Sequence, residues 1–156
     1  MEMNEDFLDM TRALVAEKVD FMLVGAFALA AHTLPRATRD IDFFVLAEAE
    51  NASRIIKALA RFGAPFDHIS AADFERQGMV FQIGVEPRRI DIITEISGVD
   101  FREAYPRALT TDLDGMKIKV LSLQDLLAHK RAGGRLQDLA DVEMLERHLA
   151  AGRLPR

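Results

Sequence analysis

The sequence predicts a single domain of the α/β (α+β) class, with a mixed β-sheet flanked by helices. Short apolar runs of strand length alternate with longer amphipathic segments, and residues typical of turns separate them. The length of 156 residues is usual for one domain, large enough to bury about two-thirds of its unfolded surface. We therefore expect one domain over residues 1–156, with a core at about 21–121 and two C-terminal helices at about 122–150.

Helices and short apolar strands are expected to alternate in the N-terminal half. Apolar spacing near one helical turn predicts the helices, and continuous apolar runs predict the strands. The expected elements are a helix at 6–19, a strand at 20–24 that ends at Gly25, an Ala-rich helix at 26–32, a strand at 40–46, and a helix at 48–62 that ends at Gly63.

Strands come in adjacent pairs in the C-terminal half. Residues 79–85 and 89–94 are expected to be strands joined by a short link, and a brief helix follows that breaks near Pro106. Residues 110–120 predict a second hairpin, because Asp114-Gly115 is a strong turn signal. Ser122, with Asp125 three residues on, resembles a capping box that begins the first of the two C-terminal helices.

Composition excludes several classes of protein. The chain has no cysteine, and its four histidines have no spacing typical of a zinc site. The acidic N-terminus does not resemble a signal peptide, and no apolar run approaches the roughly 18 residues that span a bilayer. The net charge of −5 disfavours broad binding to duplex nucleic acid. We expect a cytoplasmic protein with no membrane partner and no sequence-specific duplex DNA partner.

Two carboxylates interrupt an otherwise apolar strand. Asp40 and Asp42 are two residues apart, so their side chains project from the same face of the strand. Converging carboxylates repel each other unless a cation lies between them, and Mg²⁺ is commonly held by one or two carboxylates together with substrate phosphates. The alternative is that both aspartates pair with nearby basic side chains such as Arg36 or Arg39.

Two further features bear on this choice. The strand that ends at Gly25 runs straight into a helix, and the free N–H groups at such a helix start bind phosphate; a plain tight turn is the alternative. Asp91 interrupts a later apolar strand and could complete a metal site or accept a proton from an attacking hydroxyl. An ion pair with Arg88 or Arg89 is the alternative for Asp91.

Basic residues outside these strands are further candidates. Lys130 falls on the apolar face of its helix, where a lysine must reach water, a carboxylate or a ligand. Asp138 and Asp141 on the next helix are candidate partners, so a salt bridge and a phosphate contact both stay open. Arg39, beside the carboxylate pair, could bind phosphate or acceptor.

In order, these features resemble the nucleotidyltransferase superfamily of DNA polymerase beta. Gly25 and a small residue, followed after a short interval by Asp40-Ile41-Asp42-Phe43, match its motif. The stretches "VGAFALAAHTLPRATRDIDFFV" and "VLSLQDLLAHKRAGGRLQDLADVEML" look most like the branch of AbiEii-like toxins of toxin–antitoxin systems and its bacterial relatives.

The resemblance implies the nucleotidyltransferase fold and a minimal enzyme that transfers a nucleoside monophosphate from an NTP to a hydroxyl. Asp40 and Asp42 would hold Mg²⁺ or Mn²⁺, and Asp91 would be the third metal-site carboxylate and would activate the acceptor. Gly25 and Ala26 would present N–H groups to the phosphates, although the family usually has Gly or Ser where this chain has Ala26.

Further implications concern the helices and the partners. In that branch a Lys and a following Asp pair approach the nucleotide, which makes Lys130, Asp138 and Asp141 candidate nucleotide-binding residues. The acceptor could be a tRNA, a protein or a small molecule, and a cognate antitoxin is a possible partner. The alternative function is a catalytically inactive subunit of the same fold that acts through a partner protein.

Overall fold

The computed structural model describes residues 4–32, 40–65 and 67–152. Within these residues, six strands form one mixed sheet in the order β3-β4-β2-β1-β6-β5. The strands are β1 (Phe21–Val24), β2 (Asp40–Val45), β3 (Val80–Ile83), β4 (Arg89–Ile93), β5 (Leu109–Leu113) and β6 (Met116–Val120). The predicted mixed sheet flanked by helices is confirmed.

Strand pairing brings segments distant in sequence together at the centre of the sheet. β1 pairs with β2 in antiparallel fashion, whereas β2 and β4 run parallel. The outer strands form two antiparallel hairpins, β3–β4 and β5–β6, and the second hairpin joins the sheet through a parallel pairing of β6 with β1. β2 and β4, which carry the candidate carboxylates, are therefore direct neighbours.

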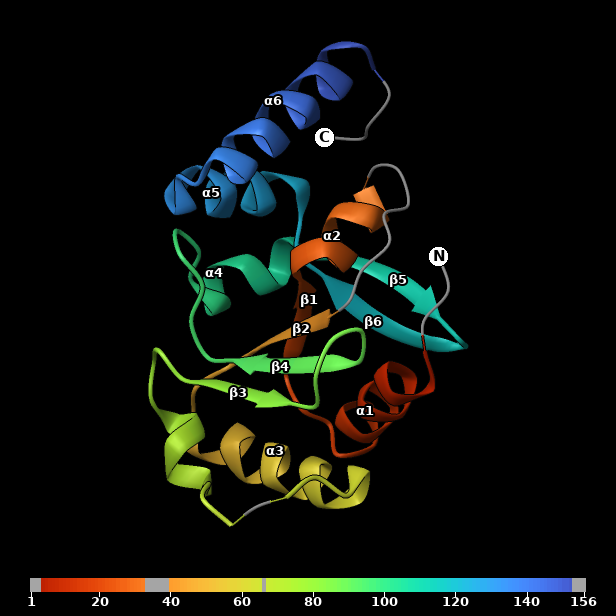
Figure 1. Ribbon diagram of the computed structural model, residues 1–156, viewed down its shortest axis with the longest axis vertical. Helices are drawn as coiled ribbons and strands as arrows, with labels where there is room; N and C mark the ends of the chain where they lie inside the picture. The colour runs from red at the N-terminus through yellow and green to blue at the C-terminus, as the bar shows by residue number, and fades with distance from the viewer. Residues whose placement is uncertain (1–3, 33–39, 66, 153–156) are drawn as a thin grey trace.

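Helices cover the sheet on both sides. In Figure 1, α1 (Glu5–Ala16) and α3 (Ala49–Phe62) lie below the sheet, and α2 (Gly25–His32), α5 (Leu123–Gly133) and α6 (Leu136–Ala150) lie above it. A short helix, α4 (Phe101–Ala104), continues into the 3₁₀ turn η2 (Tyr105–Arg107). No helix in the described parts of the chain is both long enough and apolar enough to cross a membrane.

Side-chain alternation along β2 separates the core from the candidate site. Ile41, Phe43 and Val45 are fully buried, and the Phe43 ring packs edge-on against Phe21 of β1 at 5.6 Å between ring centroids. The neighbouring positions, Asp40 and Asp42, are half-buried. Because successive side chains of a strand point to opposite faces, the two carboxylates share the face opposite to this apolar layer.

Local sequence signals account for most of the element ends. Asp114 and Gly115 both have positive φ, +52° and +83°, as the tight β5–β6 turn requires. The Ser122 side chain accepts a hydrogen bond from the Asp125 backbone N–H and so caps α5, as expected. Gly63 ends α3 in the left-handed conformation.

One element was not predicted. A 3₁₀ helix, η1 (Ala71–Glu75), lies between α3 and β3. Ser70 and Asp73 form a capping box at its start, and the Phe74 side chain is fully buried beneath it. Its single buried aromatic shows no helical period, so the sequence pattern alone did not reveal it.

Candidate active site

The pairing of β2 with β4 places the three candidate aspartates side by side. Asp42 lies opposite Asp91 in the parallel register, and Asp40 lies opposite Arg89, two residues before Asp91. Asp91 is 5% exposed because β4 lies between β2 and β3. Asp40 and Asp42 are less deeply buried, at the N-terminal end of β2.

The carboxylates of Asp40, Asp42 and Asp91 form one cluster. One oxygen from each lies within 4.8 Å of the oxygens of the other two. The sequence-based prediction that these three side chains converge is confirmed by this geometry.

The turn from β1 into α2 lies directly against the cluster. Gly25 begins α2 with φ of +67°, and a Cβ atom at this position would lie 2.3 Å from the Asp42 Oδ2 atom. A side chain here would therefore need both a strained backbone and a displaced carboxylate. The glycine keeps the backbone of the turn in close contact with Asp42, where a ligand held by that carboxylate would also meet the turn. Ala26, the next residue, is half-buried in the first turn of α2.

Crowding of negative charge changes the acidity of the central carboxyl group. Burial, a hydrogen bond with Asp91 and the negative charge of Asp40 raise the pKa of Asp42 to about 8. Arg89 acts in the opposite direction but does not offset these effects. In the protein without a bound cation, Asp42 therefore keeps a proton at neutral pH, within its hydrogen bond to Asp91.

A basic side chain adjoins the cluster. Arg89 donates a hydrogen bond from Nη2 to Asp40 Oδ2 at 2.6 Å, and its Nε lies 3.3 Å from Asp91 Oδ1. Its Nη1 lies 3.6 Å from Glu86 Oε1 in the turn between β3 and β4. An ion pair with Arg88 or Arg89 is the alternative role that the sequence analysis allows for Asp91. The structure shows both the ion pair and the cluster.

The donor set fits a hard divalent cation. Carboxylate oxygens are the ligands that Mg²⁺ and Mn²⁺ prefer. A cation between converging carboxylates would also offset their mutual repulsion. Asp91 Oδ1 is also buried with no hydrogen-bond partner, because Arg89 Nε near it lacks the alignment of a hydrogen bond. Asp40, Asp42 and Asp91 are thus the residues that would hold a metal ion.

Lys130 lies in a second polar cluster, between α5 and α6. Its Nζ atom lies 3.0 Å from Asp141 Oδ2 and 3.6 Å from Asp138 Oδ1, and both carboxylates are almost completely buried. Arg135 also contacts Asp138 and lowers the pKa of that carboxyl group, mainly through a hydrogen bond. The expected partners of Lys130 are therefore confirmed as ion-pair partners. A contact of these residues with nucleotide stays a prediction.

One candidate lies outside the part of the chain that the structure describes. Arg39, a predicted phosphate or acceptor contact, directly precedes β2 and falls in the segment 33–39. The predicted contact of Arg39 with phosphate or acceptor therefore stays a prediction.

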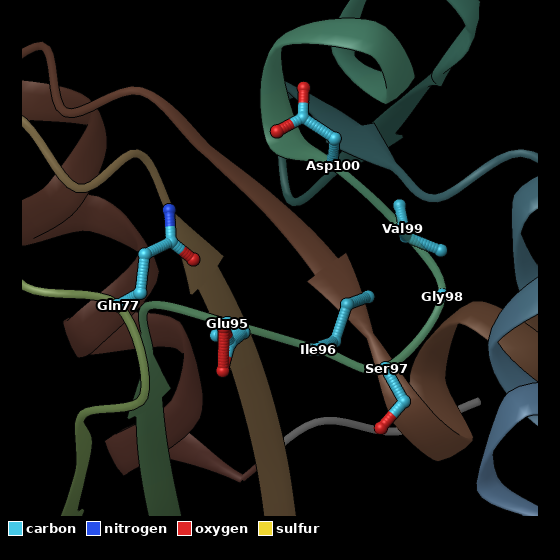
Figure 2. A pocket seen from close by; sticks show the side chains of 7 residues that line it. All are labelled: Gln77, Glu95, Ile96, Ser97, Gly98, Val99 and Asp100. Carbon is cyan, nitrogen blue, oxygen red and sulfur yellow. The ribbon is translucent and has the colours of Figure 1, made fainter.

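A hollow of about 470 Å³ adjoins the segment that follows β4. Figure 2 shows this segment, from Glu95 to Asp100, curving around the hollow, with Gln77 beside Glu95 at one end. A smaller hollow shares Gln77 and Asp100 and reaches Phe44, which lies on the same face of β2 as Asp40 and Asp42. Sequence reasoning missed the hollow, because Gln77 and Asp100 meet only through the fold.

Sequence reasoning also did not predict that Arg89 contacts both Asp40 and Asp91. A signal was available, because Arg89 precedes Asp91 by two residues on a strand and so shares its face. Its contact with Asp40 depends on the pairing of β2 with β4, which the sequence does not give.

The sheet order, the three carboxylates and the glycine turn together define a protein of the nucleotidyltransferase fold. The crystal structure of a protein from Thermotoga maritima, described as a candidate nucleotidyltransferase, superposes with a TM-score of 0.56 at 20% sequence identity, over 93% of this chain and 91% of that one. The family model described as "Nucleotidyl transferase AbiEii toxin, Type IV TA system" matches residues 6–154. The chain therefore belongs to the AbiEii nucleotidyl transferase toxin family. No curated protein sequence matches it.

Proposed function

We propose that the protein is a metal-dependent nucleotidyltransferase that transfers a nucleoside monophosphate from an NTP to a hydroxyl acceptor, as the toxin of a toxin–antitoxin pair. The observation that carries the proposal is the cluster of Asp40, Asp42 and Asp91 against the Gly25 turn. Membership of the AbiEii family supports the transferase class and the toxin role.

In the proposed reaction, the acceptor oxygen forms a bond to the α-phosphorus, and the bond from that phosphorus to the pyrophosphate oxygen breaks. A bound divalent cation would neutralise charge on the triphosphate. Asp40 and Asp42 would hold the cation, and Asp91 would take the proton of the acceptor hydroxyl. Gly25 and Ala26 offer backbone N–H groups to the phosphates. Pyrophosphate leaves with the electron pair of the broken bond.

Arg39 and the Lys130 cluster have proposed roles at the edges of this site. Arg39 directly precedes Asp40 in sequence and is proposed to contact a phosphate or the acceptor. Lys130, with Asp138 and Asp141, is proposed to approach the nucleotide from α5 and α6. Because Lys130 of α5 already forms ion pairs with Asp138 and Asp141 of α6, its main role is to stabilise the packing of these two helices.

The two hollows, which share Gln77 and Asp100 in their lining, are proposed to receive the rest of the substrates. The larger is lined by side chains that accept hydrogen bonds from N–H and O–H groups, among them Gln77, Glu95, Ser97 and Asp100. We assign to it the base or sugar of the nucleotide, or the acceptor itself. The acceptor classes are a tRNA, a protein and a small molecule.

An inactive binding subunit of the same fold is the second candidate function. Two observations favour it: Ala26 stands where the family usually has Gly or Ser, and Arg89 already neutralises part of the carboxylate cluster. Such a subunit would act by binding a partner protein.

The test is a transfer assay with each of the four labelled NTPs, with Mg²⁺ or Mn²⁺, and with total tRNA, protein extract or small hydroxyl compounds as acceptors. We expect labelled product from the wild-type protein, and none from Asp42→Asn or in excess EDTA. Normal metal-dependent binding of NTP without transfer to any acceptor would favour the inactive subunit.

Melting temperatures provide a second readout. A ligand that binds only the folded state stabilises it by mass action, so Mg²⁺ with an NTP should raise the melting temperature. NTP alone should change it little, because the triphosphate and the carboxylates repel each other. Equal shifts with and without metal would contradict the proposed mechanism.

A further inference from the structure

Arg89 makes contacts that a metal ion would also make. Its guanidinium group reaches Asp40 Oδ2 at 2.6 Å and Asp91 Oδ1 at 3.3 Å, and these oxygens belong to two of the three clustered carboxylates. A guanidinium group is always charged, and its planar fork can contact two carboxylates at once. In this structure a side chain of the protein itself thus supplies positive charge to the cluster.

The fit of Arg89 to the two carboxylates is uneven. The contact to Asp40 is a short hydrogen bond, whereas Nε and Asp91 Oδ1 lie close but are not aligned as donor and acceptor. Both of these atoms are buried without a hydrogen-bond partner among the described residues. A cation with freer geometry than the guanidinium could satisfy Asp91 Oδ1 better.

Glu86 is an alternative ion-pair partner for the Arg89 side chain. Glu86 Oε1 lies 3.6 Å from Arg89 Nη1, and the Glu86 side chain is 48% exposed. The Arg89 side chain is itself 29% exposed, so it can turn toward Glu86 and water without leaving a buried charge behind.

We propose that Arg89 is an internal counter-cation, which neutralises Asp40 and Asp91 in the metal-free protein and which a divalent metal ion displaces toward Glu86. The inference rests on the proposed function, since it takes the carboxylate cluster as the metal site. It adds that the affinity for metal is set by a competition within the chain. Metal binding and the release of Arg89 become a single event.

The test measures Mn²⁺ affinity without nucleotide, by titration calorimetry or by the electron paramagnetic resonance signal of free Mn²⁺. Arg89→Gln removes the competitor, so we expect it to bind Mn²⁺ about tenfold more tightly than the wild type. In EDTA the same variant should melt at least about 3 °C lower, because its carboxylates lose their counter-cation.

Arg88→Gln is the matched control. It makes the same chemical change at the adjacent position, where Arg88 is largely exposed and contacts Asp6 instead of the cluster. We expect its Mn²⁺ affinity to equal that of the wild type within twofold. An equal gain in both variants would show an effect of net charge alone and would overturn the proposal.

Other outcomes separate this inference from the proposed function. Wild type and Arg89→Gln that bind Mn²⁺ equally well would overturn the role of Arg89 and leave the metal site standing, whereas no Mn²⁺ binding by either would overturn the metal site as well. If Arg89→Gln does not fold, Arg89→Lys replaces it, because a single ammonium group cannot reproduce the planar fork that spans both carboxylates. We then expect tighter Mn²⁺ binding than in the wild type, and unchanged affinity would count against the proposal.

A measurement on the unaltered side chain completes the test. The Nε–H resonance of Arg89 in the ¹⁵N spectrum should shift when Mg²⁺ saturates the wild-type protein. A resonance that stays in place at saturation would show that the metal binds without displacing Arg89, and would overturn the proposal.

Discussion

Asp42→Asn should stabilise the metal-free protein at neutral and alkaline pH, although it removes a residue of the candidate active site. Burial and the neighbouring carboxylates raise the pKa of Asp42 from 3.8 to about 8 in the folded protein. Between these two values the folded state keeps a proton that the unfolded state has lost. The free energy of unfolding therefore falls as pH rises through this range, and the loss is complete above about pH 8.

The magnitude follows from the size of the shift. One pKa unit corresponds to about 1.4 kcal/mol, so the shift amounts to a loss on the order of 4 kcal/mol by pH 7. Asparagine does not titrate, and its amide can still donate a hydrogen bond to Asp91. The difference in stability between variant and wild type should thus grow with pH, by at most about 1.4 kcal/mol per unit.

The assay is urea unfolding followed by circular dichroism, in EDTA, at several pH values from 5 to about 8.5. Asp67→Asn, the same change at an exposed position, serves as the control and should run parallel to the wild type. Parallel profiles for Asp42→Asn and the wild type would refute the reasoning, because they would show that Asp42 ionises normally in the folded protein. Saturating Mg²⁺ should stabilise the wild type and leave the variant unchanged.

Three further substitutions have specific expected outcomes. Asp91→Asn should keep most metal-dependent NTP binding but slow transfer by about 10² to 10⁴, the usual contribution of a positioned general base; transfer at the wild-type rate would exclude that role. Gly25→Ala should abolish Mn²⁺ binding, because the new Cβ would displace Asp42, whereas Gly63→Ala, also at positive φ but with no atom within 4 Å, should only lower stability. Equal Mn²⁺ binding by both would contradict the close contact. Lys130→Met should cost about 3 to 5 kcal/mol in urea unfolding, since it leaves two buried carboxylates without their lysine; a loss under about 1 kcal/mol would show that Arg135 suffices.

Features that depend on residues close together in the sequence were predicted well. The period of two along β2 placed Asp40 and Asp42 on one face, and Asp114-Gly115 marked the β5–β6 turn. These signals act over a few residues, where backbone geometry leaves few choices.

Features that depend on strand pairing were not predictable in the same way. That Asp91 joins the pair was inferred from its isolation in an apolar strand, but its register opposite Asp42 comes from the parallel pairing of β2 with β4. The contact of Arg89 with Asp40 has the same origin. No local pattern encodes which strands become neighbours, so charge balance within the cluster emerged only with the fold.

The backbone of Leu121 connects the C-terminal helices to the β1–α2 segment that contains the glycine turn. Its N–H donates to the Leu23 carbonyl at the end of β1, and its own carbonyl accepts from His32 Nε2 at the end of α2, at 2.7 Å. The turn at Gly25 lies between these two anchor points, and Ser122, the cap of α5, is the next residue along the chain. A displacement of α5 and α6, for example by a protein bound to them, would pull on Leu121, the one residue whose N–H and C=O groups hold the glycine turn from both sides. A path of contacts from the C-terminal helices to the glycine turn thus runs through the Leu121 main chain and the His32 side chain.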